Sequence, residues 1–182
     1  MQTFQYALVA RALDCGAWGV IFPRVESVEL LQKAISWTKF PPAGVRGYGL
    51  LVHQVEYEKK ALPEVIEHCN NNTMVVLQIE TKRAFAMREE LLSVPGIDAV
   101  MVGPADLSVS LGVPGEFEST VLIDTVEAIR ESCEKHGVSP GIQTRSIKSA
   151  KFWKERGMRF LGCSSDLSMM YERASEIAAA LQ

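Results

Sequence analysis

The chain has 182 residues, a length that predicts a single domain able to bury a core without disulfide bonds. Hydrophobic residues make up 47% of it and charged residues 23%, which is typical of a globular protein and excludes a largely disordered chain. Its 19 basic and 22 acidic side chains give a net charge of -3, so we expect no nucleic-acid partner.

The cysteines and the hydropathy pattern bear on the compartment. Cys15, Cys69, Cys133 and Cys163 lie far apart, with no Cys-x-x-Cys pair, which favours buried or half-buried free thiols over a zinc site or a disulfide framework. The first residues lack the pattern of a signal peptide, and no apolar run reaches the ~18 residues of a membrane span. We therefore expect a cytoplasmic protein without membrane contact.

Short apolar runs alternate with helical patterns along the chain. Helices are predicted at 2–14, 27–35, 55–69, 82–92, 122–133, 147–156 and 167–181. Strands are predicted at 18–22, 74–79, 99–102, 138–142 and 160–163. Residues 38–50 are rich in Pro and Gly and predict a structured loop. The tryptophans Trp18, Trp37 and Trp153 and the Met/Leu stripe of the last helix are expected in the core.

Five strand-then-helix units predict parallel strands with right-handed crossovers. Such strands form either an open doubly wound sheet, which five units alone favour, or part of a closed (β/α)8 barrel. A complete barrel typically needs ~250 residues, so about a quarter of that length is absent from this sequence. The residues at the ends of the strands favour the barrel.

Two neighbouring strands are each followed by a carboxylate. Glu80 comes directly after the run 75–79, and Asp106 follows the run 100–102 beyond a Gly-Pro turn. Because neighbouring strands lie about 4.8 Å apart, carboxylates at their carboxyl ends converge, and such a pair suits Mg²⁺ or Mn²⁺. Alternatively, Glu80 caps the helix that follows it, and Asp106 is a helix N-cap. The Gly-Pro-Ala-Asp turn also leaves backbone N–H groups that can hold a carboxylate.

Several strings of the sequence occur together in one known family. They lie at 16–23, 41–47 (Pro-Pro-x-Gly-x-Arg-Gly), 78–81 (Gln-Ile-Glu-Thr), 94–98, 103–108 (Gly-Pro-Ala-Asp-Leu-Ser) and 162–167. The pattern resembles the HpcH/HpaI aldolase family, metal-dependent (class II) pyruvate aldolases of the phosphoenolpyruvate/pyruvate superfamily. The resemblance covers nearly the whole chain, and it implies one partial aldolase/citrate-lyase-type domain over 1–182, a (β/α)8 barrel of TIM type that is incomplete.

The resemblance also implies an activity and a site. The family cleaves 4-hydroxy-2-oxo acids into pyruvate and an aldehyde through a metal-stabilised enolate. By this resemblance Glu80 and Asp106 are the ligands of a divalent metal ion (Mg²⁺, Mn²⁺ or Co²⁺), and Gln78 lies beside the metal. The segment Gly103, Pro104, Ala105 and Asp106 holds the carboxylate of the 2-oxo acid substrate. The family's last helix often packs on a neighbouring subunit, so a homo-oligomer is expected.

The sequence departs from the family in three respects. The family's first three strands, which carry a general-base histidine and a substrate-binding arginine, would precede residue 1. His53, His68 and His136 lie in loops or at helix ends and replace neither. Arg24 follows a strand where the family has smaller residues or an imidazole, so it is either a catalytic-site arginine for a substrate carboxylate or a solvated rim charge.

Two further features keep alternatives open. Residues 143–145 (Gln-Thr-Arg) replace a more apolar stretch of the family and leave the substrate preference open, and Arg46 matches a family arginine in a loop, where packing is the favoured role. The main functional alternative is a catalytically inactive truncated homologue that binds metal or a 2-oxo acid, or serves as an assembly subunit. Any activity that survives is expected to be oxaloacetate decarboxylation.

Overall fold

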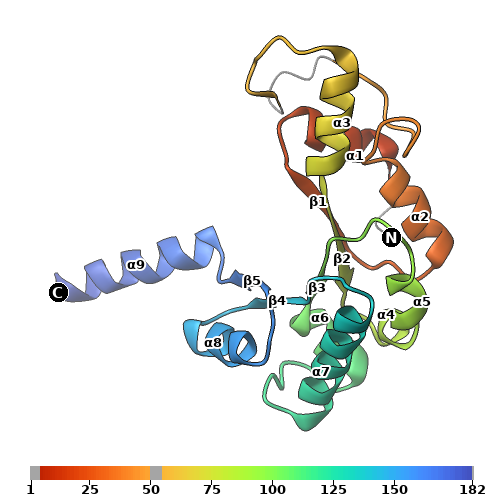
Figure 1. Cartoon of the computed structure of the whole chain (residues 1–182). Helices are drawn as coiled ribbons and strands as arrows, with labels where there is room; N and C mark the ends of the chain where they lie inside the picture. The colour runs from red at the N-terminus through yellow and green to blue at the C-terminus, as the bar shows by residue number, and fades with distance from the viewer. Residues whose placement is uncertain (1–4, 50–54, 182) are drawn as a thin grey trace.

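The computed structural model describes residues 5–49 and 55–181 and contains one curved, five-stranded parallel sheet (Figure 1). The strands follow each other in chain order, β1-β2-β3-β4-β5. Their bounds are β1 Gly19–Phe22, β2 Met74–Ile79, β3 Ala99–Val102, β4 Gly141–Thr144 and β5 Phe160–Cys163. Sequential order with parallel pairing is the arrangement of a (β/α)8 barrel, so the sheet is a partial TIM-barrel-like fold and not a doubly wound one.

Helices precede, connect and follow the strands, and those that connect them lie on one side of the sheet (Figure 1). They are α1 Tyr6–Asp14, α2 Val28–Ser36, α3 Leu62–Asn72, α4 Lys82–Ala86, α5 Arg88–Leu92, α6 Pro104–Leu111, α7 Thr120–Lys135, α8 Ile147–Glu155 and α9 Asp166–Ala180. A serine or threonine hydroxyl accepts a backbone N–H at the start of five of them, which satisfies a donor that the helix leaves open. These N-caps are Ser27, Thr81, Ser119, Ser146 and Ser165.

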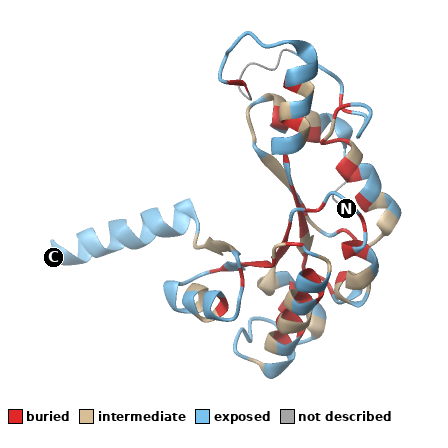
Figure 2. Ribbon diagram, viewed as in Figure 1, coloured by how far each residue is buried: buried red, intermediate tan, exposed pale blue. Residues whose placement is uncertain are grey.

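The alternation of side chains along the strands divides the core in two. Phe22, Leu77, Val100 and Ile142 belong to the larger cluster, which the strands share with the helices. The alternate residues form a smaller cluster of Val76, Ala99 and Met101, with Phe160 packed against it. Buried residues accordingly gather along the sheet and on the inner sides of the helices (Figure 2). The strand ends are thereby fixed by packing from both faces.

Several predicted elements differ from the structure. The helix predicted at 55–69 begins at Leu62, since Pro63 is favoured in the first turn, and it continues through Asn72. The helix predicted at 82–92 is two short helices that meet at Met87, and the strand predicted at 138–142 lies at 141–144. The helix α6 at Pro104–Leu111 was not predicted, and the other strands and helices lie within a few residues of their predicted positions.

The predicted core residues were only partly right. Trp37 and Trp153 are buried, but Trp18 is 60% exposed. The stripe of the last helix was assigned to the core, yet α9 has no buried residue and extends away from the sheet (Figures 1 and 2). Cys15 is likewise exposed, in contrast to the thiols of Cys69 and Cys133. Over the described ranges, no helix has the length and apolarity needed to cross a membrane.

A buried arginine holds the loop after α2 to the rest of the fold. Arg46 is only 2% exposed, and its Nη2 donates to Asp14 Oδ1 at 2.7 Å, while its guanidinium lies 4.7 Å from the centre of the Phe40 ring. An arginine buried in this way depends on its partner, because an unpaired charge in the interior is costly. The packing role expected for Arg46 is therefore confirmed.

We predict that Asp14→Asn lowers the free energy of unfolding by about 2 kcal/mol, because it removes the charged acceptor of a buried guanidinium. Denaturant unfolding followed by circular dichroism measures the change. The matched control is Glu176→Gln, which removes the partner of the exposed Arg173 at 2.9 Å and should cost less than about 0.5 kcal/mol. Equal losses in the two variants would contradict the structural role of Arg46.

Candidate functional site

Three neighbouring strands end at one cluster of charged side chains. Arg24 follows β1 after one proline, Glu80 follows β2 directly, and Asp106 lies in the first turn of α6 after β3. The Arg24 backbone N–H donates to Glu80 Oε1 at 3.1 Å, and its Nη2 donates to Asp106 Oδ1 at 2.8 Å. The Arg24 Nε lies 3.9 Å from Glu80 Oε1. The two carboxylates predicted to converge at adjacent strand ends therefore lie close together. Arg24 bridges them.

The carboxylate of Glu80 is buried, and its surroundings are built around it. Glu80 is 3% exposed, and Gln78 Nε2 donates to its Oε2 while the Arg24 backbone donates to its Oε1. Burial raises the pKa of Glu80, and the nearby charge of Asp106 raises it further; the hydrogen bond from Gln78 and the charge of Arg24 act against this. A positive charge beside Glu80 therefore favours its ionised form.

The capping roles considered for the two carboxylates are not those in the structure. Thr81, not Glu80, is the N-cap of α4, and its Oγ1 accepts from the backbone N–H of Ala84. Gly103 is at the N-cap of α6 and Asp106 is three residues further on, with its side chain directed to Arg24. Both carboxylates are therefore available to a cation.

The backbone at Arg24 is in an unusual conformation. Its φ of 51° is in the left-handed region, which costs a residue with a side chain of order 1 kcal/mol and persists only where the surroundings impose it. The conformation lets the backbone N–H and the guanidinium of one residue approach the same pair of carboxylates. The side chains of Arg24 and Asp106 are 55% and 54% exposed, so their ion pair can exchange with solvent ions, whereas Glu80 cannot move away.

The segment between β3 and α6 approaches Glu80 closely. A Cβ atom at Gly103 would lie 2.9 Å from Glu80 Oε2 and 3.0 Å from Gln78 Nε2, so only glycine leaves the carboxylate in place. Pro104 begins α6, and the N–H groups of Ala105 and Asp106 belong to its first turn, where a helix has no partners of its own for them. Gln78, Gly103, Ala105 and the carboxylates therefore lie around one small region.

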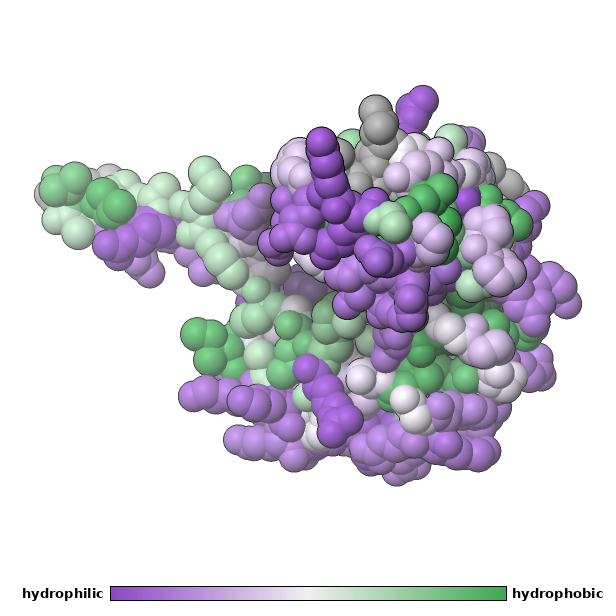
Figure 3. All heavy atoms as spheres, turned by 45° about the horizontal axis from the view of Figure 1, so that its top comes forward, coloured by the Kyte–Doolittle hydropathy of each residue, from purple (hydrophilic) through white to green (hydrophobic). Residues whose placement is uncertain are grey.

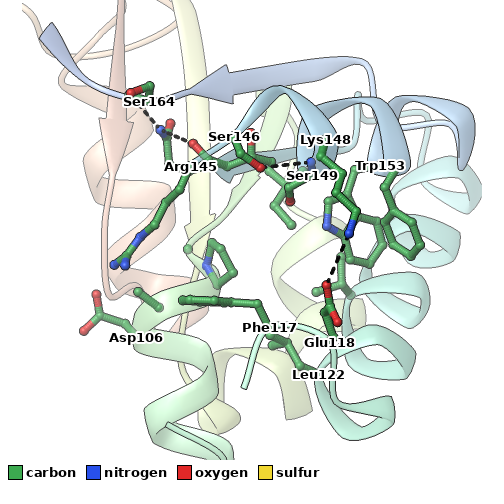
Figure 4. Close-up of a pocket in the computed structure, with 18 of the residues that line it drawn as sticks. Asp106, Phe117, Glu118, Leu122, Arg145, Ser146, Lys148, Ser149, Trp153 and Ser164 are labelled. Atoms are coloured by element: carbon green, nitrogen blue, oxygen red, sulfur yellow. Dashed lines mark hydrogen bonds and ion pairs between the residues drawn. The ribbon is translucent and has the colours of Figure 1, made fainter. Parts of the chain in front are cut away.

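This region opens into a cavity of about 1100 Å³. Its lining runs from Gln78 and the 103–106 segment to side chains of the loop before α7, of β4 and of α8. Figure 4 shows Asp106 at one end, with the Arg145 side chain extending toward it and Phe117 beneath. Hydrophobic residues gather in the middle of one face of the molecule, with hydrophilic residues around them (Figure 3). The site thus adjoins a cavity large enough for a small organic acid.

The residues present fit a divalent cation that also binds substrate and water. Among the described residues no group of three or more His, Cys, Asp or Glu side chains could enclose a metal, so Glu80 and Asp106 offer two ligands. Mg²⁺ commonly binds through one or two carboxylates and completes its shell with substrate and water. The guanidinium of Arg24 supplies the positive charge that this pair of carboxylates requires.

The two described histidines, His68 and His136, lie away from the site. The ring of His136 contacts Glu89 on α5 at 3.1 Å, and His68 contacts Asn72 within α3. His53 lies outside the described residues. The expectation that His68 and His136 are not catalytic agrees with their positions at helix ends.

Two residues that line the cavity, Phe117 and Lys148, were not predicted from the sequence. The bridging of both carboxylates by Arg24 was not predicted either. Phe117 and Lys148 lie away from any motif. The signal available for Arg24 was only its place after a strand end. Arg145 also follows a strand, and the sequence marked it as unusual without giving it a role.

The sequence of the chain is similar to those of known proteins. The sequence pattern of HpcH/HpaI aldolase/citrate lyase matches residues 2–171. The chain belongs to the HpcH/HpaI aldolase/citrate lyase family. It is 29% identical over 171 residues to a 4-hydroxy-2-oxo-heptane-1,7-dioate aldolase of Shigella flexneri, covering 94% of this chain and 64% of that protein. The chain thus spans about two thirds of the length of this curated relative.

Solved structures of the family have the same fold. The crystal structure of an HpcH/HpaI aldolase from Desulfitobacterium hafniense matches with a TM-score of 0.91 at 28% identity, covering 98% of this chain and 69% of that one. A citrate lyase beta subunit from M. tuberculosis, complexed with oxaloacetate and magnesium, matches with a TM-score of 0.52 at 14% identity, over 86% of this chain and 61% of that one. The second likeness shows the fold alone.

We predict that Arg24→Gln raises the affinity of the chain for Mn²⁺ about tenfold, because it removes the charge that competes for both carboxylates. Isothermal titration calorimetry measures the affinity without any need for catalysis. Arg83→Gln is the matched control, since Arg83 lies 4.0 Å from Glu26 and does not contact Glu80 or Asp106. The affinity of this variant for Mn²⁺ should not change. Unchanged or weaker binding in Arg24→Gln would show that Arg24 does not compete with a metal.

Proposed function

We propose that this chain is a metal-dependent carbon–carbon lyase that acts on 2-oxo acids and releases pyruvate. The observation that carries the proposal is the pair Glu80 and Asp106, joined by Arg24 beside the 103–106 segment. The family supports the reaction class, and the curated relative supports 4-hydroxy-2-oxo acids as substrates, with pyruvate and an aldehyde as products.

Each residue of the site has a role in this proposal. Glu80 and Asp106 would hold the divalent ion (Mg²⁺, Mn²⁺ or Co²⁺), and Gln78 would keep Glu80 in position through its hydrogen bond. The N–H groups of Ala105 and Asp106 would bind the substrate carboxylate, with Gly103 and Pro104 shaping the turn. When bound, the cation stabilises the negative charge that develops on the 2-oxo oxygen as the carbon–carbon bond breaks.

Arg24 would also bind substrate once a metal ion shares the carboxylates of Glu80 and Asp106. Its side chain is 55% exposed, and its backbone is held next to Glu80, so the guanidinium can turn toward a substrate carboxylate without leaving the site. A planar guanidinium binds a carboxylate through two parallel hydrogen bonds. We infer that Arg24 assists in substrate binding, as expected from its place at a strand end.

We predict that the chain decarboxylates oxaloacetate in the presence of Mn²⁺ and that Glu80→Gln lowers the rate at least 100-fold. In this reaction the bond between C3 and the departing carboxylate breaks, CO₂ leaves, and the electron pair forms the enolate of pyruvate. No hydroxyl proton has to be removed, so no general base is needed for the bond-breaking step. Release of CO₂ and pyruvate, measured with and without the metal, reports the activity.

The control for this experiment is Glu118→Gln. Glu118 lines the same cavity, but it is 93% exposed and its ion pair is with Lys148, at 4.0 Å. This variant should keep the rate of the unmodified chain. If Glu80→Gln and the unmodified chain have equal rates above the background with metal alone, the proposed lyase site is wrong.

A binding role without turnover is the second candidate function. It is favoured by one observation: within the described part of the chain, no histidine lines the cavity that could act as a general base for aldol cleavage. In that case the chain would bind a metal and a 2-oxo acid, as an inactive homologue or an assembly subunit. Metal-dependent binding of pyruvate without decarboxylation of oxaloacetate distinguishes this candidate from the lyase.

We also propose that the chain forms a homo-oligomer through α9. Large apolar side chains of α9, Leu167, Met170, Tyr171 and Ile177, are exposed, and none of its residues is buried. Contiguous exposed apolar surface of this kind is typical of an interface between subunits. A second copy of the same chain would cover it.

We predict that Leu167→Asp with Met170→Asp lowers the mass in solution to that of one chain, because two charges placed on the apolar surface oppose its burial. Light scattering coupled to size exclusion measures the mass. Ser168→Asp with Glu172→Gln, on the same helix, adds and removes one charge without touching the apolar residues and should leave the mass unchanged. A single-chain mass for the unmodified protein would contradict the proposal.

A further inference from the structure

Arg145 lies at the edge of the cavity and has no acidic partner in the part of the chain that the structure describes. Within the described residues, no carboxylate oxygen lies within 4 Å of its guanidinium, whereas Arg24, Arg46 and Arg130 each have an acidic partner within 3 Å. Arg145 directly follows β4, and β4 pairs with β3, the strand that leads to the 103–106 segment. The carboxyl ends of these neighbouring strands place Arg145 and Asp106 at the same edge of the sheet.

The backbone on both sides of Arg145 is held. Thr144 pairs with Cys163 of β5 and accepts the Ser164 backbone N–H at 2.8 Å, and Gln143 Nε2 donates to the Ser164 carbonyl at 3.1 Å. On the other side, Ser146 is the N-cap of α8. The arginine therefore begins from a fixed point between a strand and a helix, which reduces the entropy lost when it binds a ligand.

An aromatic ring orients the side chain. The guanidinium carbon of Arg145 lies 5.2 Å from the centre of the Phe117 ring, a cation–π contact from the loop between α6 and α7. In Figure 4 the arginine extends from β4 over Phe117 toward Asp106, along the cavity. A contact with the ring does not use the N–H groups of the guanidinium, and these groups bind carboxylates.

The other charges in the cavity leave room for an anion beside Arg145. Asp106 is paired with Arg24 at 2.8 Å, and Glu118 is paired with Lys148 at 4.0 Å. Glu172, on the exposed helix α9, is the third carboxylate among the described lining residues. Two of the three lining carboxylates, those of Asp106 and Glu118, thus already have cationic partners.

We propose that Arg145, oriented by Phe117, is a specificity-determining residue that binds a second carboxylate at the far end of the substrate. The chain would therefore select 2-oxo acids that end in a carboxylate over those that end in a neutral group. This inference rests on the proposed function, because the 2-oxo acid end of the substrate is taken to lie at Glu80, Asp106 and the first turn of α6.

A matched pair of small ligands tests the proposal without catalysis. 2-Oxoglutarate and 2-oxopentanoate both have five carbons and differ only in a terminal carboxylate or methyl group. Calorimetric titration of the 182-residue chain with each, in the presence of Mn²⁺, should give about tenfold tighter binding of 2-oxoglutarate, as expected for a charge-assisted pair of hydrogen bonds. The ratio of the two dissociation constants is the measured quantity.

Variants then identify the residue responsible. Arg145→Gln should reduce the ratio to about one while binding of 2-oxopentanoate is retained, and Arg145→Lys should keep part of the preference. Phe117→Leu should lower the ratio without abolishing it, because the arginine loses its orientation but not its charge. Lys151→Gln, on α8 and outside the cavity, removes a positive charge of the same helix region and should leave the ratio unchanged.

The outcomes separate this inference from the proposed function. Binding of both ligands that depends on Glu80, with no preference between them, would overturn the role of Arg145 and leave the lyase proposal intact. A preference that survives in Arg145→Gln but is lost in Lys148→Gln would also overturn it and assign the subsite to Lys148. If neither ligand binds in the presence of Mn²⁺, both proposals fail together.

Discussion

The burial of one negative charge, that of Glu80, determines the arrangement of the residues around it. A carboxylate that is 3% exposed must either bind a proton or be compensated, and its raised pKa records the cost of the charged form. Two donors compensate it, the Arg24 backbone N–H after β1 and the Gln78 amide within β2, and Gly103 after β3 leaves the carboxylate the space that it occupies.

The sequence predicted the framework of this site because its signals are local. Parallel strands buried on both faces appear as continuous apolar runs, and a carboxylate that follows such a run must lie at the edge where the next strand also ends. Both Glu80 and Asp106 follow runs of this kind. The strand at 138–142 was misplaced because its apolar residues, Val138 and Ile142, lie at its two ends, whereas pairing with β5 begins at Gly141.

Other features depend on contacts between distant segments, and no local pattern carries them. The exposure of α9 depends on what packs against its apolar stripe, and within the described residues nothing buries it. The pairing of Arg24 with both carboxylates depends on a left-handed backbone conformation, for which an arginine gives no signal. Phe117 reaches the cavity from a loop, and its relation to Arg145 exists only once β4 and the loop before α7 are placed.

Three arginines of the chain illustrate how burial and partners distinguish structural from functional charge. Arg46 is buried and paired with Asp14, so its charge is committed to the fold. Arg24 is half-exposed and pairs with two carboxylates, and under the proposed function it would give way to a divalent cation. Arg145 has a fixed backbone and an oriented side chain but no acidic partner among the described residues, and this combination is receptive to an anion. One electrostatic principle explains these differences between Arg46, Arg24 and Arg145. A guanidinium binds an anion most readily where its desolvation costs little and no carboxylate is already paired with it.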